Sequence, residues 1–237
     1  NGKGDNWWCV LFPNYCLIET NKDTEYIELA SVTIPNSVIS IGEYAFYNCP
    51  QLSSVILSEN LKTIGESAFS DCNISRIKLP KTLKSIRKGT FFRCENLMSV
   101  EFSEGIQNIG ESAFEYCSNL TNITFPNTLT DIGSHAFWDS GLISVIIPDN
   151  VKYIQHGAFN NCPLNKVTIY GRPSIQDAAI SLSEGADVYC YSPTPPKITD
   201  ISFSGDGSAI LYVPKGSKNE YEIGYWKYYF SEIKEMD

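Results

Sequence analysis

Apolar residues recur along most of this chain in units of 21 to 23 residues. Each unit is centred on a string of the form Ile-Gly-x-x-Ala-Phe-x-x-Cys, and the stretch from Ile64 to Cys72 is a complete example. The repeated phenylalanines are Phe46, Phe69, Phe91, Phe114, Phe137 and Phe159, and Ile180 marks a degenerate seventh unit. A constant period in this range indicates a solenoid, in which similar coils stack along one axis.

A second apolar string precedes each phenylalanine, and Leu29, Val32 and Ile34 form its first copy. Its last two apolar residues alternate with polar ones, which predicts a short strand with one buried face. Further along each unit, the spacing from Ile64 to Ala68 is typical of a helical face. One coil is therefore predicted to be a strand, a turn, an extended segment and a short helix or 3₁₀ turn.

A single coil cannot fold alone. About six inward apolar residues contribute roughly 2 kcal/mol each, whereas ordering about 22 backbone units costs roughly 1–2 kcal/mol apiece. Stacking is therefore obligatory, and both open ends need caps. We expect one structural domain with an N-terminal cap over residues 1–28, a solenoid over 29–185 and a C-terminal cap over 186–237.

The repeated string resembles the leucine-rich repeats of the BspA-like type, which occur chiefly in surface proteins of Bacteroides-type bacteria. The resemblance covers about residues 29–185, with departures at Arg87, Thr90 and Ser140. It implies a leucine-rich repeat solenoid, a right-handed β/α superhelix of about seven coils, that is β-rich with short helical or 3₁₀ turns. It also implies an exported protein, either on the bacterial cell surface as an outer-membrane lipoprotein or secreted, with an adhesin-like role.

Net charge narrows the choice of partner. The chain carries a formal charge of −9, with a sequence pI near 4.8. Nucleic-acid binding normally needs clustered Lys and Arg, so we expect no nucleic-acid partner.

We expect no transmembrane segment, since no run of 18 apolar residues occurs. Asn1–Asn6 contain no signal-peptide core, as expected if a signal was removed or the sequence trimmed.

Five of the eight cysteines occupy one repeat position. They are Cys49, Cys72, Cys94, Cys117 and Cys162, and Ser140 fills the same position in another unit. No C-x-x-C pair is present, so a zinc site is not indicated and the pattern predicts a ladder of buried thiols. Cys9 and Cys16 flank a candidate turn, and a disulfide between them is an open alternative.

The sequence gives no support for an enzyme. No G-x-S-x-G or H-E-x-x-H string and no Gly-rich phosphate loop occurs. His135 and His156 lie in adjacent units at positions that differ by one residue, so two exposed histidines are expected rather than a metal or catalytic pair. We therefore assign no catalytic residue, no cofactor and no metal site.

Two sets of outward residues are candidates for binding. The first is the outer face of the strands, where solenoids commonly recognise macromolecules. Its candidates are Arg76, Lys78, Glu101, Asn122 and Lys166. The second is the edge after each phenylalanine, where the large aromatic residues are Tyr47, Phe92 and Trp138. Each set has an alternative without a binding role. The strand face could simply be solvated, and the aromatic residues could be partly buried under neighbouring coils.

The C-terminal region adds an aromatic run, from Tyr225 to Phe230. Capping of the last coil accounts for it, and Ser217 is a candidate N-cap for a helix that ends between Tyr221 and Ile223. A carbohydrate platform built from Tyr225, Trp226, Tyr228 and Tyr229 is the alternative.

The leading functional hypothesis is a monomeric, non-enzymatic surface module that recognises a host protein or glycoprotein. A spacer without a ligand and a glycan-binding module are the competing hypotheses.

Overall fold

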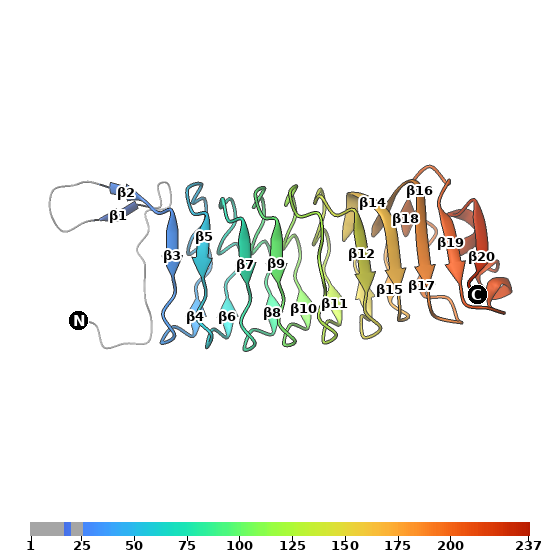
Figure 1. The fold of residues 1–237 in the computed structure, drawn as a ribbon, viewed down its shortest axis with the longest axis horizontal. Helices are drawn as coiled ribbons and strands as arrows, with labels where there is room; N and C mark the ends of the chain where they lie inside the picture. The colour runs from blue at the N-terminus through green and yellow to red at the C-terminus, as the bar shows by residue number, and fades with distance from the viewer. Residues whose placement is uncertain (1–16, 20–25) are drawn as a thin grey trace.

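The computed structural model describes residues 17–19 and 26–237, and its coils stack in a row along the long axis of the molecule (Figure 1). The predicted leucine-rich repeat solenoid is confirmed, with parallel strands that repeat at the predicted period. The number of coils is larger than expected, at about nine turns. The excess arises at the C-terminal end, where β19 (Ile210–Val213) and β20 (Glu232–Glu235) continue the parallel sheet from β16 (Ile180–Cys190).

The longer strands form one side of the solenoid, which we call the strand face. Its first sheet contains β3 (Ser31–Thr33), β5 (Ser54–Ile56), β7 (Arg76–Lys78) and β9 (Ser99–Glu101). Its second contains β12 (Ser144–Ile147), β14 (Phe159–Ile169), β16, β19 and β20, with β18 (Phe203–Ser204) paired to β16. The middle residue of each three-residue strand points into the core, because side chains alternate along a strand.

A second side, the back sheet, consists of two-residue strands. β4 (Ser40–Ile41) pairs with β6 (Thr63–Ile64). The rest of this side is one sheet of β8 (Ser85–Ile86), β10 (Asn108–Ile109), β11 (Asp131–Ile132), β13 (Tyr153–Ile154), β15 (Ser174–Ile175) and β17 (Lys197–Ile198). Near the N-terminus, β1 (Leu17–Glu19) and β2 (Tyr26–Glu28) form an antiparallel pair. The rest of the predicted N-terminal cap, including Cys9 and Cys16, lies outside the described residues.

The predicted helix or 3₁₀ turn within each coil is wrong. Residues 29–185, all described, contain turns but neither type of helix. In their place, left-handed residues occur at regular points, such as Ser67 and Asp71 with φ of 50° and 57°. Such residues stop helix propagation. The backbone N–H groups then bond between coils, as when Phe69 N donates to Thr90 O at 2.9 Å.

The repeated phenylalanines form a continuous column through the core. Consecutive rings from Phe46 to Phe159 lie 5.1 to 5.7 Å apart between centroids, and their planes differ by 1° to 11°. Five of these six side chains are completely buried, and the exposed fraction of Phe46 is 5%. The repeat motif is thus a packing module whose inward residues meet their counterparts in the next coil.

Four of the five repeat cysteines form the predicted buried ladder. Cys72, Cys94, Cys117 and Cys162 are free and buried. Each S–H group donates to the carbonyl of a phenylalanine in the preceding coil, as from Cys72 Sγ to Phe46 O at 3.0 Å. Cys49 is the exception and corrects the prediction, because it is disulfide-bonded. The position therefore favours a small side chain that can also donate a hydrogen bond.

These thiols should resist modification in the native protein. Burial raises the pKa of Cys72 to about 12 and that of Cys162 to about 11. At pH 8 their thiolate fraction is therefore very small, and access is closed as well. We expect a maleimide to leave Cys72, Cys94, Cys117, Cys162 and Cys190 unmodified until denaturant is added, whereas an exposed Ser53→Cys control reacts at once. Equal reaction rates for the control and the repeat cysteines in native protein would contradict the packing described above.

The C-terminal end contains the two helical segments of the described residues, α1 (Lys218–Tyr221) and the 3₁₀ helix η1 (Trp226–Tyr228). The expected helix after Ser217 is present, but Ser217 does not cap it through its side chain, and its hydroxyl donates to Pro214 O instead. No helix in residues 17–19 and 26–237 has the length and apolar character needed to cross a membrane.

Candidate functional site

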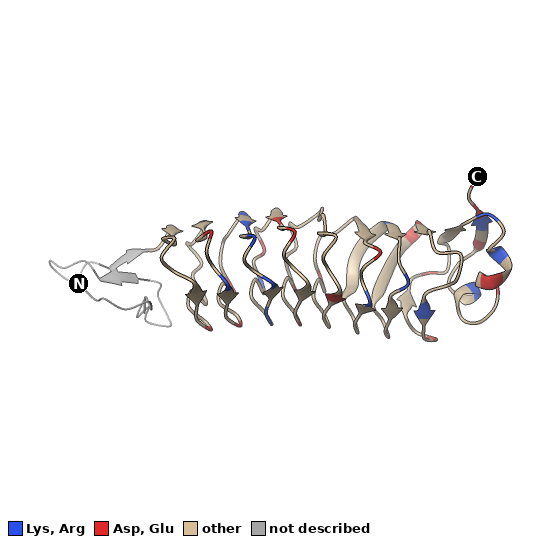
Figure 2. Ribbon diagram, turned by 90° about the horizontal axis from the view of Figure 1, so that it is seen from below, with Lys and Arg blue, Asp and Glu red and all other residues tan. Residues whose placement is uncertain are grey.

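The strand face brings together the three charged residues predicted near its N-terminal half. Lys78 on β7 lies opposite Glu101 on β9, and Lys78 Nζ is 3.3 Å from Glu101 Oε1. Arg76 is two residues from Lys78 on the same strand and is exposed. Both members of the ion pair are about two-thirds exposed, so the pair contributes little to stability. Figure 2 shows acidic and basic residues spread along the solenoid.

Asn122 lies at a break in the strand face. The segment 121–126 has no strand assignment, and the sheet that ends at β9 resumes only at β12. Phe102 and Phe125 occupy positions that hold leucine or isoleucine in the coils from Ile34 to Ile169, and their rings pack edge to face with centroids 6.1 Å apart. A hollow of about 420 Å³ opens beside them, lined in part by Glu101 and Thr124. Asn122 is exposed, and it lies between the two sheets of the strand face without belonging to either.

Lys166 belongs to a different part of the strand face, on β14. Its Nζ lies 4.9 Å from the centre of the Tyr189 ring on the neighbouring strand β16. Tyr189 in turn stacks on Tyr212 of β19, with centroids 4.6 Å apart and planes that differ by 8°. Partial burial raises the pKa of Tyr189, with Asp187 adding to the shift, so its hydroxyl remains a hydrogen-bond donor at neutral pH.

A second tyrosine pair lies beside the first. Tyr170 and Tyr191 directly follow β14 and β16, and their rings stack with centroids 4.8 Å apart. Tyr191 is two residues beyond Tyr189 and so faces the same side of the sheet. We call Tyr170, Tyr189, Tyr191 and Tyr212 the tyrosine cluster. Tyr170 and Tyr191 are 48% and 46% exposed, so the cluster offers aromatic surface to a partner.

The tyrosine cluster is absent from the candidates predicted from the sequence, because residues 186–237 were expected to form a cap rather than further strands of the same face. Continuing the same alternation from Lys166 and Thr168 to Asp187 and Tyr189, and then to Ile210 and Tyr212, would have located it.

The aromatic edge does not form one patch. Tyr47, Phe92 and Trp138 lie in every second coil, and each packs on a local neighbour. Between ring centroids, Tyr47 lies 5.8 Å from Tyr44, Phe92 lies 5.7 Å from Tyr116, and Trp138 lies 4.5 Å from His135. Arg93 also lies over both rings of the Phe92–Tyr116 pair. These aromatic residues are therefore three separate contacts along the turn edge.

The rings of His135 and His156 lie 5.1 Å apart between centroids, in a T-shaped arrangement. His135 is half-buried rather than exposed, and its Nε2 is buried with no hydrogen-bond partner. Within residues 17–19 and 26–237, no group of three His, Cys, Asp or Glu side chains is arranged to hold a metal ion.

The four aromatic rings do not form the carbohydrate platform that was the alternative to a cap. Trp226 is buried, its Nε1 donates to Pro196 O at 3.0 Å, and its ring stacks on Phe230. Tyr229 is half-buried, with its hydroxyl donating to Thr199 O and accepting from Ser202 N. Tyr225 and Tyr228 remain exposed, at 48% and 71%. The aromatic run therefore mainly holds the last coils together.

Comparison with protein families gives a match to the BspA type leucine-rich repeat region, with six copies over residues 21–143 and 138–205. A short match to stage II sporulation protein R covers residues 1–22, which lie almost entirely outside the described part of the chain. Comparison with curated proteins gives no match.

Solved structures with the same fold include a leucine-rich repeat protein of T. pallidum. It is 33% identical to this chain with a TM-score of 0.56, and the match covers 60% of this chain and 74% of that one. The pneumococcal vaccine antigen PcpA is 19% identical with a TM-score of 0.55, covering 89% of this chain and 68% of that one. A leucine-rich cell surface protein of Faecalibacterium prausnitzii is 20% identical with a TM-score of 0.39, covering 90% and 80%.

Proposed function

Since this chain belongs to the BspA-type leucine-rich repeat family, we propose that it is an exported, non-enzymatic surface module that recognises a protein or glycoprotein partner through its strand face. The observation that carries the proposal is the tyrosine cluster. Aromatic residues are enriched at protein interfaces, and tyrosine supplies contact area at a low cost in conformational entropy.

The surroundings of the cluster support a binding role. Ile146 on β12 is 55% exposed and is separated from Tyr189 by one strand at the same level of the sheet. Positive and negative side chains surround the aromatic rings. They are Lys166, Asp187 and the ion pair between Glu232 and Lys234. An apolar and aromatic centre with a charged rim is the usual anatomy of an interface. The Arg76, Lys78 and Glu101 group lies further along the same face, where it would contribute orientation.

The proposal is tested with a Tyr170→Ala, Tyr191→Ala double variant. A screen against host extracellular proteins with unaltered protein first supplies a partner. We then expect the double variant to bind at least about tenfold more weakly, because tyrosines in an interface centre commonly contribute 2 kcal/mol or more. Tyr153→Ala is the matched control, since Tyr153 is 49% exposed but lies on the back sheet.

Equal binding by all three proteins would show that the partner does not use the tyrosine cluster. A screen without any partner would favour the alternative of a spacer that has no ligand.

A further inference from the structure

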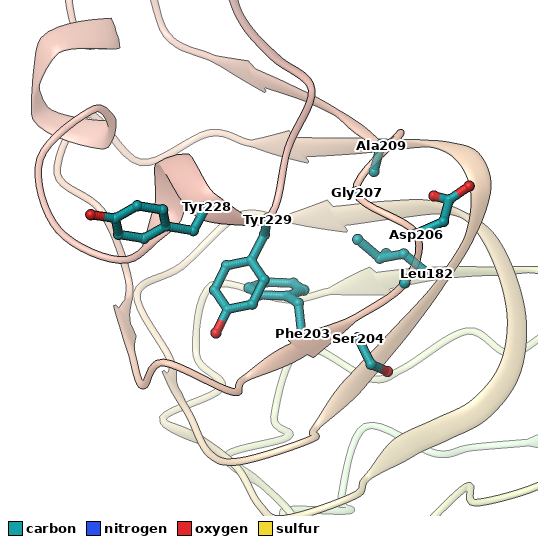
Figure 3. A pocket seen from close by; sticks show the side chains of 9 residues that line it. Leu182, Phe203, Ser204, Asp206, Gly207, Ala209, Tyr228 and Tyr229 are labelled. Carbon is teal, nitrogen blue, oxygen red and sulfur yellow. The ribbon is translucent and has the colours of Figure 1, made fainter.

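A pocket of about 190 Å³ opens at the C-terminal end, and no residue of the tyrosine cluster lines it (Figure 3). We call it the C-terminal pocket. Its floor is apolar and consists of Leu182, Phe203 and Ala209, all of which are buried. The glycine-containing loop after β18 forms one side, and the end of η1 forms the other.

The two sides of the C-terminal pocket differ in chemistry. Figure 3 shows Tyr228 and Tyr229 on one side, and Ser204 and Asp206 on the other. Tyr229 is fixed, because its ring packs on Phe203 with centroids 5.3 Å apart and its hydroxyl is bonded to the backbone. The Tyr229 ring is therefore already in place opposite the polar side, whereas Tyr228 is 71% exposed.

The polar side is also organised. Asp206 Oδ1 accepts from Ser208 N at 2.9 Å and from Ser208 Oγ at 2.5 Å. These bonds lower the pKa of Asp206, so it is ionised at neutral pH, and neither bond uses Oδ2. Ser204 Oγ shares a 2.9 Å hydrogen bond with Ser181 Oγ. A Cβ on Gly207 would have no atom within 4 Å, so the loop backbone can be approached closely.

The charge on the C-terminal pocket selects against anions. Asp206 is the one charged residue among those that line it, and it repels anions such as phosphates and acidic sugars. Asp206 does not exclude a cation, but Lys227 Nζ already lies 4.9 Å from the centre of the Tyr228 ring, where it competes with an incoming cation for that ring. An uncharged ligand avoids both the repulsion from Asp206 and the competition at Tyr228.

The remaining choice is between an apolar side chain and a neutral molecule with hydroxyl groups. An apolar group would remove water from Asp206 and Ser204 without replacing its hydrogen bonds, which is costly. A pyranose ring can place its C–H face on the aromatic side and its hydroxyls on the polar side. The volume suits one ring, since a cavity of ~150 Å³ holds benzene and pockets for larger ligands start at ~300 Å³.

We propose that the C-terminal pocket binds a single neutral sugar residue, such as the exposed end of a glycan. None of the residues that line this site belongs to the tyrosine cluster, so a glycoprotein partner can be engaged at both places. A ligand of this size is expected to bind with a Kd on the order of 1 mM, because few atoms contribute.

Saturation-transfer NMR with methyl glycosides of glucose, galactose, mannose and N-acetylglucosamine tests this proposal. We expect transfer to the ring protons of at least one glycoside and none to glucuronic acid. Asp206→Ala and Tyr228→Ala should each weaken binding about tenfold, through loss of a charged hydrogen bond and of aromatic contact. Tyr225→Ala is the matched control, since Tyr225 is exposed but does not line the pocket.

The absence of transfer from all four glycosides would overturn the proposal. So would equal binding by the Asp206→Ala, Tyr228→Ala and unaltered proteins, or preferential binding of a charged sugar. Because both altered side chains are exposed, unchanged thermal midpoints should accompany the loss of binding. Loss of binding together with a general loss of folded protein in both variants would also contradict the structure of this pocket.

Discussion

Replacing Phe114 by alanine should lower the free energy of unfolding by about 3–5 kcal/mol, the usual cost of removing a buried phenylalanine. The Phe114 ring is completely buried and stacks on Phe91 and Phe137 at 5.3 and 5.2 Å. The edge of Phe102 also packs on it. The substitution therefore interrupts the phenylalanine column at its middle and leaves a cavity between the coils of Phe91 and Phe137.

Thermal and urea denaturation measure this effect, with Phe92→Ala as the control. Phe92 is the same residue type but lies half-exposed on the turn edge, so its loss should shift the midpoint only slightly. Because each coil contacts only its neighbours, Phe114→Ala should also separate the transition into two steps, as the halves of the solenoid become uncoupled. Equal midpoints for the two variants would show that the column does not carry the stability assigned to it.

Replacing Gly65 by alanine should destabilise the solenoid by about 1–3 kcal/mol, the range for overpacking, and more if the coils cannot separate. A Cβ at Gly65 would lie 2.6 Å from Glu43 Cα and closer still to Glu43 N and Gly42 C in the preceding coil. These are main-chain atoms, so no side-chain rotation relieves the contact. The two coils would have to move apart at that point.

Gly42→Ala is a matched control, because Gly42 holds the same repeat position in the first coil. A Cβ there would have no atom within 4 Å. Neither glycine has a positive φ, so alanine adopts both conformations, and Gly42→Ala should be neutral or stabilising by about 0.4–1 kcal/mol. Urea denaturation of the two variants compares them directly. Equal effects would mean that close coil contact at Gly65 is not required.

The sequence alone predicted the features that depend on which residues of a coil are buried. Ile64, Ala68, Phe69 and Cys72 recur because each coil must fill the same interior volume, and this requirement repeats with the period. The solenoid, its short strands and the inward residues could therefore be derived from spacing, and the leucine-rich repeat type followed from the resemblance of the repeated string. The helix assignment failed because a spacing of three or four residues fits a left-handed turn as well as a helix, and inter-coil hydrogen bonds favoured the turn.

The tertiary structure decided which outward residues meet. Tyr170 and Tyr191 are 21 residues apart, and they stack only because β14 and β16 pair in one register. The structure also distinguished Gly65 from Gly42, although the local motif is the same at both. Burial requires apolar residues at the same positions in every coil, so the core residues can be identified from a single sequence. Outward contacts follow from the register between coils and from the residues that differ among repeats, which local spacing does not determine.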